Sequence, residues 1–280
     1  MCENKSEKWD RAAVDYQRAF TLGLNDYNAG LLRFWHEAGM LFPGCRVLDI
    51  GCGVGKYGTC LAALGYDVTL TDISGEMLRH ASENMVKFRT PWAVYQCDFN
   101  DATGTEPVFA GGFDLTISTM SPAIHDVATV RKMSSMTRGW CFLARFREWE
   151  QPFRDALMLR MGLDPRSQFE SLEEDVAAMI YSVEEAGFTP TVKIVDYCWS
   201  DSRTPEQMAG YLCRNYFPEE EAVDSLRETA LRCAREMAGK DGFVEDSVNA
   251  KVAWIYWNVN EPVCLGGTTA CGDAGKKENE

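Results

Sequence analysis

The densest group of residues that could bind a ligand is the run from Val47 to Gly55. It places Asp49 near the end of a short apolar stretch and then repeats glycine at alternate positions, Gly51, Gly53 and Gly55. Glycines directly after a strand allow a sharp turn and a close approach of the backbone to a ligand. The free N–H groups of a helix that follows point at the same place. The run therefore predicts a ligand site where a strand passes into a helix.

A second carboxylate supports this interpretation. Asp72 ends the next apolar stretch, roughly 20 residues further on, where it can accept hydrogen bonds from a ribose diol. The segment 53–58 (Gly-Val-Gly-Lys-Tyr-Gly) formally matches the dinucleotide pattern G-x-G-x-x-G. However, the carboxylate of Asp49 would repel a pyrophosphate, whereas it suits a ligand that carries an ammonium and a sulfonium. The phosphate-loop pattern fails because Tyr57 follows Lys56 in place of Ser or Thr.

These residues need a scaffold, and the hydrophobic pattern indicates one of alternating strands and helices. Strands are predicted over 46–50, 67–71, 93–97, 113–119, 139–146, 191–199 and 251–259. Helices are predicted over 5–20, 26–40, 55–64, 74–88 and 126–136, with a helical stretch from 147 to 186. Such alternation predicts an α/β fold with a largely parallel sheet and right-handed crossovers.

At this point a family resemblance is visible. The run from Asp49 to Gly55 resembles motif I of the class I S-adenosylmethionine-dependent methyltransferases. Thr71-Asp72-Ile73-Ser74 with Met77-Leu78 is similar to their second motif, and Gln96-Cys97-Asp98-Phe99 to their third. The resemblance covers residues 40–146. It implies a Rossmann-like, seven-stranded, mostly parallel sheet with helices on both faces and an antiparallel last strand. It also implies S-adenosyl-L-methionine as cofactor and methyl transfer as the reaction.

The resemblance further implies roles for single residues at the cofactor site. Asp49 would support the glycine turn and the methionine ammonium, and Asp72 would hold the ribose hydroxyls. Asp98 would accept from the adenine amino group, with Phe99 alongside, and Met77 would pack on the adenine. The full set expected around the cofactor is Asp49, Gly51, Gly53, Gly55, Asp72, Ile73, Met77, Asp98, Phe99 and Thr119.

The acceptor is expected over the carboxyl end of the fourth strand, where residues 118–122 read Ser-Thr-Met-Ser-Pro. Family members that methylate amino groups of bases or of glutamine often carry Asn-Pro-Pro-Tyr there, so that acceptor class loses support. His125 is the candidate general base, and its alternative is a surface histidine at a helix start. Candidates for acceptor contacts are Trp9, Tyr16, Met120, Ser121 and Arg145. The aromatic ones could instead be packing residues, and Arg145 an ordinary surface charge.

The predicted elements divide the chain into five segments. These are an N-terminal helical lid (1–44), a Rossmann-like core that binds S-adenosylmethionine (45–200), a helical insertion (201–249), the last core strand (250–260) and a disordered tail (261–280). A connection of about 50 residues is far longer than an ordinary loop, so the insertion is expected to serve function as an acceptor lid. The tail is rich in glycine, threonine and charge, which favours disorder.

Composition narrows the range of partners. The formal net charge of −14 opposes binding to nucleic acid, so a small-molecule acceptor is expected. No apolar run approaches the roughly 18 residues of a membrane-spanning helix, and the start does not resemble a signal peptide. We therefore expect a cytoplasmic protein without membrane contact. The 11 cysteines form no C-x-x-C pair, which favours reduced, structural thiols over a metal site.

Two alternatives remain open at this stage. One is a nicotinamide-dependent oxidoreductase, which the G-x-G-x-x-G match allows. The other is a non-catalytic S-adenosylmethionine-binding protein with a regulatory or assembly role, since a fold by itself does not establish activity. The residues do not identify the acceptor atom, the need for a general base or the oligomeric state.

Overall fold

The computed structural model describes residues 5–20, 25–165, 171–217 and 223–261. Its centre is a seven-stranded sheet in the order β3-β2-β1-β4-β5-β7-β6. The strands are β1 (Arg46–Ile50), β2 (Asp67–Asp72), β3 (Trp92–Gln96), β4 (Phe113–Thr119), β5 (Thr137–Glu150), β6 (Thr191–Arg203) and β7 (Val244–Asn258). Strands β1 to β5 pair in parallel, and β7 runs antiparallel between β5 and β6. The predicted fold class, including the antiparallel seventh strand, is confirmed.

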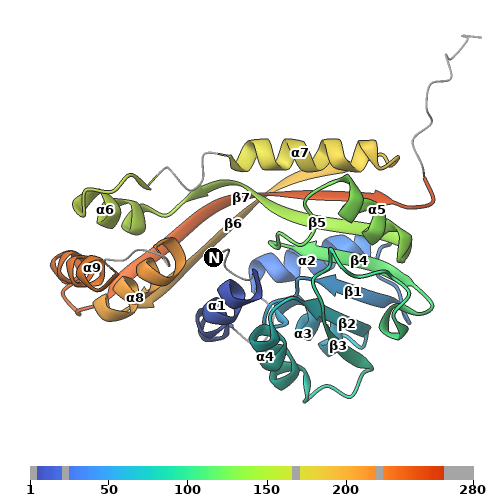
Figure 1. The fold of residues 1–280 in the computed structure, drawn as a ribbon, viewed down its shortest axis with the longest axis horizontal. Coiled ribbons are helices and arrows are strands. Elements are labelled where there is room, and N and C mark those ends of the chain that lie inside the picture. Colours follow the sequence, from blue (N-terminus) through green and yellow to red (C-terminus); the bar gives the residue numbers. More distant parts are fainter. Residues whose placement is uncertain (1–4, 21–24, 166–170, 218–222, 262–280) are drawn as a thin grey trace, which may run out of the picture.

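Helices cover both faces of the sheet (Figure 1). They are α1 (Lys5–Ala19), α2 (Asp26–Glu37), α3 (Lys56–Ala63), α4 (Gly75–Met85), α5 (Val127–Ser135), α6 (Pro152–Arg160), α7 (Leu172–Glu185), α8 (Pro205–Tyr216) and α9 (Val223–Met237), with the short 3-10 helix η1 (Pro107–Phe109). Helices α2, α3 and α4 share one apolar cluster with the sheet, and α5 and α7 share another on the opposite face. Side chains cap several starts; Ser74, for example, accepts from the Met77 N–H at the start of α4.

Burial on both faces explains why β1 reads as a continuous apolar run. Val47 belongs to the cluster under α2 to α4, while Leu48 and Ile50 belong to the cluster under α5 and α7. Side chains alternate between the two faces, so Asp49 points to the same face as Val47 and is fully buried there. The sheet therefore holds a carboxylate inside its apolar layer, directly before the glycine turn.

The last three strands are longer than the sequence predicts. The fifth and sixth strands continue beyond the predicted ends at 146 and 199, and the seventh begins before 251. Pairing explains the difference, because β5 stays paired with β7 as far as Glu150–Asn249, and β6 as far as Arg203–Val244. The helical stretch predicted from 147 accordingly begins only at α6. We call residues 147–150, 196–203 and 244–251 the arm.

The arm carries a second, small apolar core. Helices α6, α8 and α9 pack together through a cluster that includes Leu157, Met208, Leu212 and Ala230, and we call these three helices the distal lobe. Figure 1 shows the lobe at the end of the three long strands, away from the rest of the sheet. The predicted segment boundaries at 201 and 249 thus fall inside β6 and β7, and α6 joins a lobe that the prediction assigned to 201–249 alone. The predicted disordered tail lies outside the described residues, apart from Glu261.

None of the described helices is long and apolar enough to cross a membrane.

Candidate cofactor site

The glycine turn after β1 has the backbone geometry that its sequence predicts. Gly51, Gly53 and Gly55 all have positive φ, at 69°, 54° and 81°. Gly51 is also required by space, because a Cβ there would lie 1.9 Å from the Ser121 Oγ. The turn and the loop after β4 therefore lie so close together that a side chain at position 51 would clash with Ser121.

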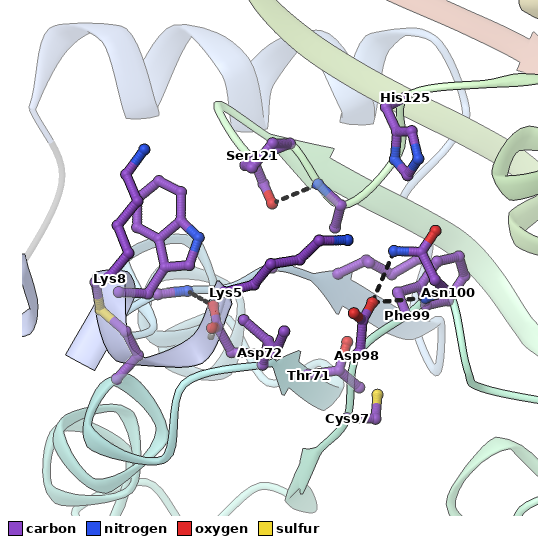
Figure 2. A pocket seen from close by; sticks show the side chains of 18 of the residues that line it. Lys5, Lys8, Thr71, Asp72, Cys97, Asp98, Phe99, Asn100, Ser121 and His125 are labelled. Atoms are coloured by element: carbon purple, nitrogen blue, oxygen red, sulfur yellow. Dashed lines mark hydrogen bonds between the residues drawn. The ribbon is translucent and has the colours of Figure 1, made fainter. Parts of the chain in front are cut away.

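A cavity of about 420 Å³ opens at the carboxyl ends of β1 to β4, and α1 covers one side of it. Its walls contain predicted residues from all three motifs and from the acceptor set (Figure 2). These are Trp9, Tyr16, Gly51, Gly53, Asp72, Ile73, Met77, Asp98, Phe99, Met120, Ser121 and His125. The carboxyl edge of a parallel sheet is where α/β folds bind ligands. One cavity thus unites residues that the sequence separates by more than 100 positions.

Asp72 stands at the end of β2 and is fixed by the turn. Its Oδ2 accepts from the Gly53 N–H and its Oδ1 from the Ser74 N–H, both at 2.9 Å. Burial raises the pKa of Asp72, these backbone hydrogen bonds counteract that rise, and Asp10 raises the pKa further. Each carboxylate oxygen has a second lone pair, so Asp72 can still accept hydrogen bonds from a ligand in the cavity.

Asp98 also lines the cavity, two residues after the end of the neighbouring strand β3. Its Oδ1 accepts from the Asn100 backbone N–H at 2.9 Å and from the Asn100 Nδ2 at 2.7 Å. Burial acts to raise the pKa of Asp98, but the hydrogen bonds from Asn100 and the nearby charges of Lys5 and His125 outweigh it, so the net pKa is lowered. Asp98 is therefore an ionised acceptor at neutral pH, and Figure 2 shows it on the same side of the cavity as His125.

Asp49 does not line the cavity but lies beneath the turn. It is fully buried, and neither carboxylate oxygen has a hydrogen-bond partner among the described residues. Burial raises the pKa of Asp49 to about 8, and the nearby charge of Asp72 adds to the rise. A buried carboxylate without partners is costly, and such a group in a native structure points to a missing ligand charge or an ionisation role.

The loop after β4, where the sequence predicts the acceptor, forms another wall of the cavity. Met120 has a φ of 53°, and among the residues that the structure describes it is the one non-glycine residue with a positive φ. This conformation costs free energy and is found most often at functional sites. Across the cavity stands Tyr16 of α1, which is 46% exposed. Burial, then the charges of Asp72 and Tyr216, raises the pKa of Tyr16. Tyr16 is thus partly exposed and yet has a pKa raised by burial, because protein atoms surround the side chain while the cavity leaves part of its surface accessible. Tyr16 thus stands between the cofactor cavity and α8 of the distal lobe.

Three other predicted residues do not line the cavity. Gly55 forms the left-handed N-cap of α3, and Thr119 is buried at the end of β4. Arg145 turns inward: its guanidinium donates to the backbone oxygens of Ser118, Ala144 and Ile124. Burial lowers the pKa of Arg145 to about 10. In this position it braces the loop after β4, and contact with an acceptor remains a prediction.

The sequence interpretation missed two lysines in the wall, Lys5 and Lys8. Figure 2 shows Lys5 reaching from α1 across the cavity toward Asp98 and Asn100. Helical spacing could have identified Lys5, because it precedes Trp9 by four residues and so lies on the side of α1 that Trp9 and Tyr16 share. Lys8 adjoins Trp9 about 100° further round the helix, so this spacing does not identify it. Asn100 was also missed, although its position two residues after Asp98 is typical of a turn in which a carboxylate accepts from the backbone.

Comparisons with known proteins match the part of the chain that contains the glycine turn. Residues 47–139 match the family described as "Methyltransferase domain". The protein YqeM of Bacillus subtilis (strain 168) is 37% identical over 83 residues, which cover 30% of this chain and 31% of YqeM. The ubiquinone biosynthesis O-methyltransferase of Albidiferax ferrireducens is 29% identical over 158 residues, 54% of this chain and 60% of that protein. The chain therefore spans less than two thirds of the length of these relatives.

Among solved structures, magnesium protoporphyrin IX methyltransferase from Synechocystis PCC 6803 with bound SAH is 20% identical, with a TM-score of 0.48 over 68% of this chain and 90% of that chain. The match over 47–139 includes the glycine turn, Asp72, Asp98 and the loop after β4, which are the residues that the cavity brings together. It speaks against the nicotinamide-dependent alternative. The match identifies residues 47–139 as a methyltransferase domain, in agreement with the motifs of the sequence.

Proposed function

We propose that this protein binds S-adenosylmethionine in the cavity at the carboxyl ends of β1 to β4 and transfers the methyl group to a small-molecule acceptor. The observation that carries the proposal is that Asp72 and Asp98, at the carboxyl ends of the neighbouring strands β2 and β3, line one cavity. Both have spare acceptor capacity after their internal hydrogen bonds, so a nucleoside with a ribose diol and an amino group can be held at both ends.

The residues present fit the methionine part as well. The Asp49 carboxylate lacks a partner beneath the glycine turn, and a cationic ligand at the turn would favour its ionised form. The bound cofactor supplies a methyl group already activated by a positively charged sulfur. The protein's task is then to hold the two reactants in line and to exclude water. In this proposal the glycine turn and Asp72 orient the cofactor, and α1 shields it from solvent.

The acceptor would enter on the side of Met120 and Tyr16. Both residues line the cavity, Met120 directly after β4 and Tyr16 on α1. The negative net charge disfavours a polyanionic acceptor. The name of the relative from Albidiferax ferrireducens, an O-methyltransferase of ubiquinone biosynthesis, supports a small organic acceptor without identifying it. Ser121, which follows Met120 in the loop after β4, would be a polar group on this side.

Calorimetry with S-adenosylhomocysteine tests the cofactor half of the proposal. Binding should release heat and raise the melting temperature, because a ligand selective for the native state stabilises it. NAD and NADP serve as control ligands and should leave the melting temperature unchanged. No binding of S-adenosylhomocysteine or S-adenosylmethionine at millimolar concentration would contradict the proposal.

Labelled S-adenosylmethionine incubated with fractionated small metabolites tests the transfer half. We expect label to move into one fraction, and an Asp72→Asn variant should lower the yield. If the cofactor binds but no fraction accepts label, the result supports the non-catalytic alternative, a regulatory or assembly protein that retains the cofactor site.

A further inference from the structure

Helix α1 is attached to the cofactor-binding half by polar contacts along one side. The Asp10 Oδ1 accepts from the Ser74 hydroxyl at 2.5 Å and from the Glu76 N–H at 3.2 Å, at the start of α4. Near its other end, the amide of Gln17 exchanges two hydrogen bonds with that of Asn84, at 3.0 and 3.3 Å. These contacts place α1 directly over the loop that holds Asp72.

The same helix is attached to the distal lobe and the arm. The Arg214 guanidinium of α8 donates two hydrogen bonds of 2.7 Å to the two carboxylate oxygens of Asp15. Arg18 donates to the Asp201 Oδ2 of β6 at 2.9 Å. Figure 1 shows α1 between α4 and the distal lobe, and direct contacts join it to both. Helix α1 therefore bridges the part of the molecule that carries the cavity and the distal lobe.

The arm offers α1 a fixed attachment point at Asp201. Asp201 also pairs with Arg203 at 2.9 Å, and Arg203 pairs with the buried Asp246 at 3.4 Å. The Arg203 guanidinium lies 4.2 Å from the centre of the Tyr211 ring, which restrains it further. Asp201 is thus held by the arm before Arg18 reaches it.

Apolar packing alone does not determine where α1 lies. Its one fully buried residue is Ala13, in a small cluster with Val54 and Met77. A 15-residue helix is marginal in water without tertiary contacts, so its polar attachments carry much of its placement. An exposed ion pair contributes little, but Asp15 is only 13% exposed and its pairing with Arg214 is bidentate.

We propose that Asp15 and Arg214, assisted by Arg18 and Asp201, are positioning residues that hold α1 closed over the cofactor. They act through Trp9 and Tyr16, which α1 presents to the cavity. The distal lobe thereby controls how long the cofactor stays bound, although none of its described residues lines the cavity. This inference rests on the proposed function, because it takes the cavity as the cofactor site.

Stopped-flow release of S-adenosylhomocysteine, followed by tryptophan fluorescence, tests the proposal. Arg214→Asp and Asp15→Arg should each accelerate release by roughly three- to ten-fold, the range of one partly shielded ion pair. The double variant with both changes restores an ion pair of reversed direction and should return release toward the wild-type rate. The matched control is Arg160→Asp, which breaks the Arg160–Glu236 pair on the lobe's surface and should leave release unchanged.

A second measurement needs no ligand. Backbone hydrogen exchange of residues 9–19 in the free protein should be faster in each single variant and slower again in the double variant. This result also separates the two proposals. If wild-type protein bound no S-adenosylhomocysteine, the cofactor assignment would fail, while hydrogen exchange would still test whether Asp15 and Arg214 hold α1 in place. Unchanged exchange and release in folded single variants, or the same acceleration in the Arg160→Asp control, would overturn the positioning role.

Discussion

Two regions, the cavity end of the sheet and the arm that carries the distal lobe, differ in whether their buried carboxylates have hydrogen-bond partners. At the cavity end, the carboxylate of Asp49 is fully buried without a partner. In the arm that carries the lobe, the buried carboxylate of Asp246 accepts from the Gln151 amide at 2.9 and 2.8 Å and pairs with Arg203. A carboxylate with such partners helps to fix its surroundings, whereas an unsatisfied charge keeps a cost that a ligand can remove. The contrast identifies the first region as built around a ligand and the second as built to keep its shape.

Backbone geometry shows the same contrast. The loop after β4 contains Met120 in the left-handed region, and the turn opposite it needs a glycine at position 51 to avoid Ser121. The lobe instead uses regular devices, such as the capping box of Thr204 and Gln207 at the start of α8. Strain at the cavity persists because the surrounding sheet holds it in place.

The largest effect that would sharpen the comparison is loss of Asp246. Asp246→Ala leaves Arg203 and Gln151 without their buried partner, which should lower the free energy of unfolding by about 3–5 kcal/mol. Affinity for S-adenosylhomocysteine should stay within about three-fold (~0.6 kcal/mol). Chemical denaturation and calorimetry measure the two quantities. Glu245→Ala, at the exposed neighbouring position of β7, is the control and should change neither. A large loss of affinity in a folded Asp246→Ala protein would contradict the separation of roles.

The opposite pattern is expected at the end of β2. Asp72→Asn removes the charge but keeps one oxygen that can accept from Gly53 or Ser74, so folding should change little. S-adenosylhomocysteine should bind more weakly by about 1.5–3 kcal/mol, the scale of hydrogen bonds to a charged group. Asp67→Asn, at the other end of the same strand, is the matched control for calorimetry. Equal affinities in Asp72→Asn and wild type would refute the ribose assignment.

The sequence was more informative about the first region than about the second, for a physical reason. The turn at 51–55, the strand-end acids and the cap at Ser74 are encoded by residue type within a few positions, so they could be predicted residue by residue. The arm depends on pairing between β5, β6 and β7 across more than 90 residues. Its alternation of buried and exposed positions at 244–250 is a strand pattern, but no local signal identifies its partner strand.

The sequence also did not predict the directions in which some candidate side chains point. Asp49 and Arg145 could be recognised as functional candidates by type, yet the sequence did not predict that one lies beneath the turn and the other points into the backbone of a neighbouring loop. Lys5 and Lys8 reach the cavity only because α1 docks on α4 and α8, which again is long-range information.

Asp49 allows the cavity end of the sheet to be tested by changing the pH. Its pKa of about 8 exceeds that of an unfolded aspartate because of burial, then Asp72. Between pH 4 and 8 the folded protein therefore keeps a proton that the unfolded chain loses, so this group lowers stability as pH rises, and the cost is complete above pH 8. Asp49→Asn cannot ionise and should be more stable than wild type by a few kcal/mol at pH 8 but not at pH 4. Urea denaturation at the two pH values measures this.

The same substitution should affect binding in the other direction. The ammonium group of S-adenosylhomocysteine would favour ionised Asp49, so wild-type affinity should rise from pH 6 to pH 8 with proton release on binding, and Asp49→Asn should lose this dependence. Calorimetry in buffers of different ionisation enthalpy detects the released proton. If wild type and variant bind with the same pH dependence, the unpartnered carboxylate does not serve the cofactor.

The smallest effect concerns His125, the candidate general base. The residue lines the cavity beside Asp98, at the end assigned to the adenine, while Met120 and Tyr16 lie at the acceptor end. Its side chain is 48% exposed, and its Nε2 lies 3.9 Å from the Asp126 Oδ2, so no close partner orients it as a base. We therefore expect His125→Gln to weaken S-adenosylhomocysteine binding by less than about three-fold (~0.6 kcal/mol). Transfer of label to the accepting metabolite fraction should fall by a similar factor. A general base contributes on the order of 100-fold or more, so a loss of that size with cofactor affinity retained would place the acceptor at the His125 end and reverse the orientation proposed for the cavity.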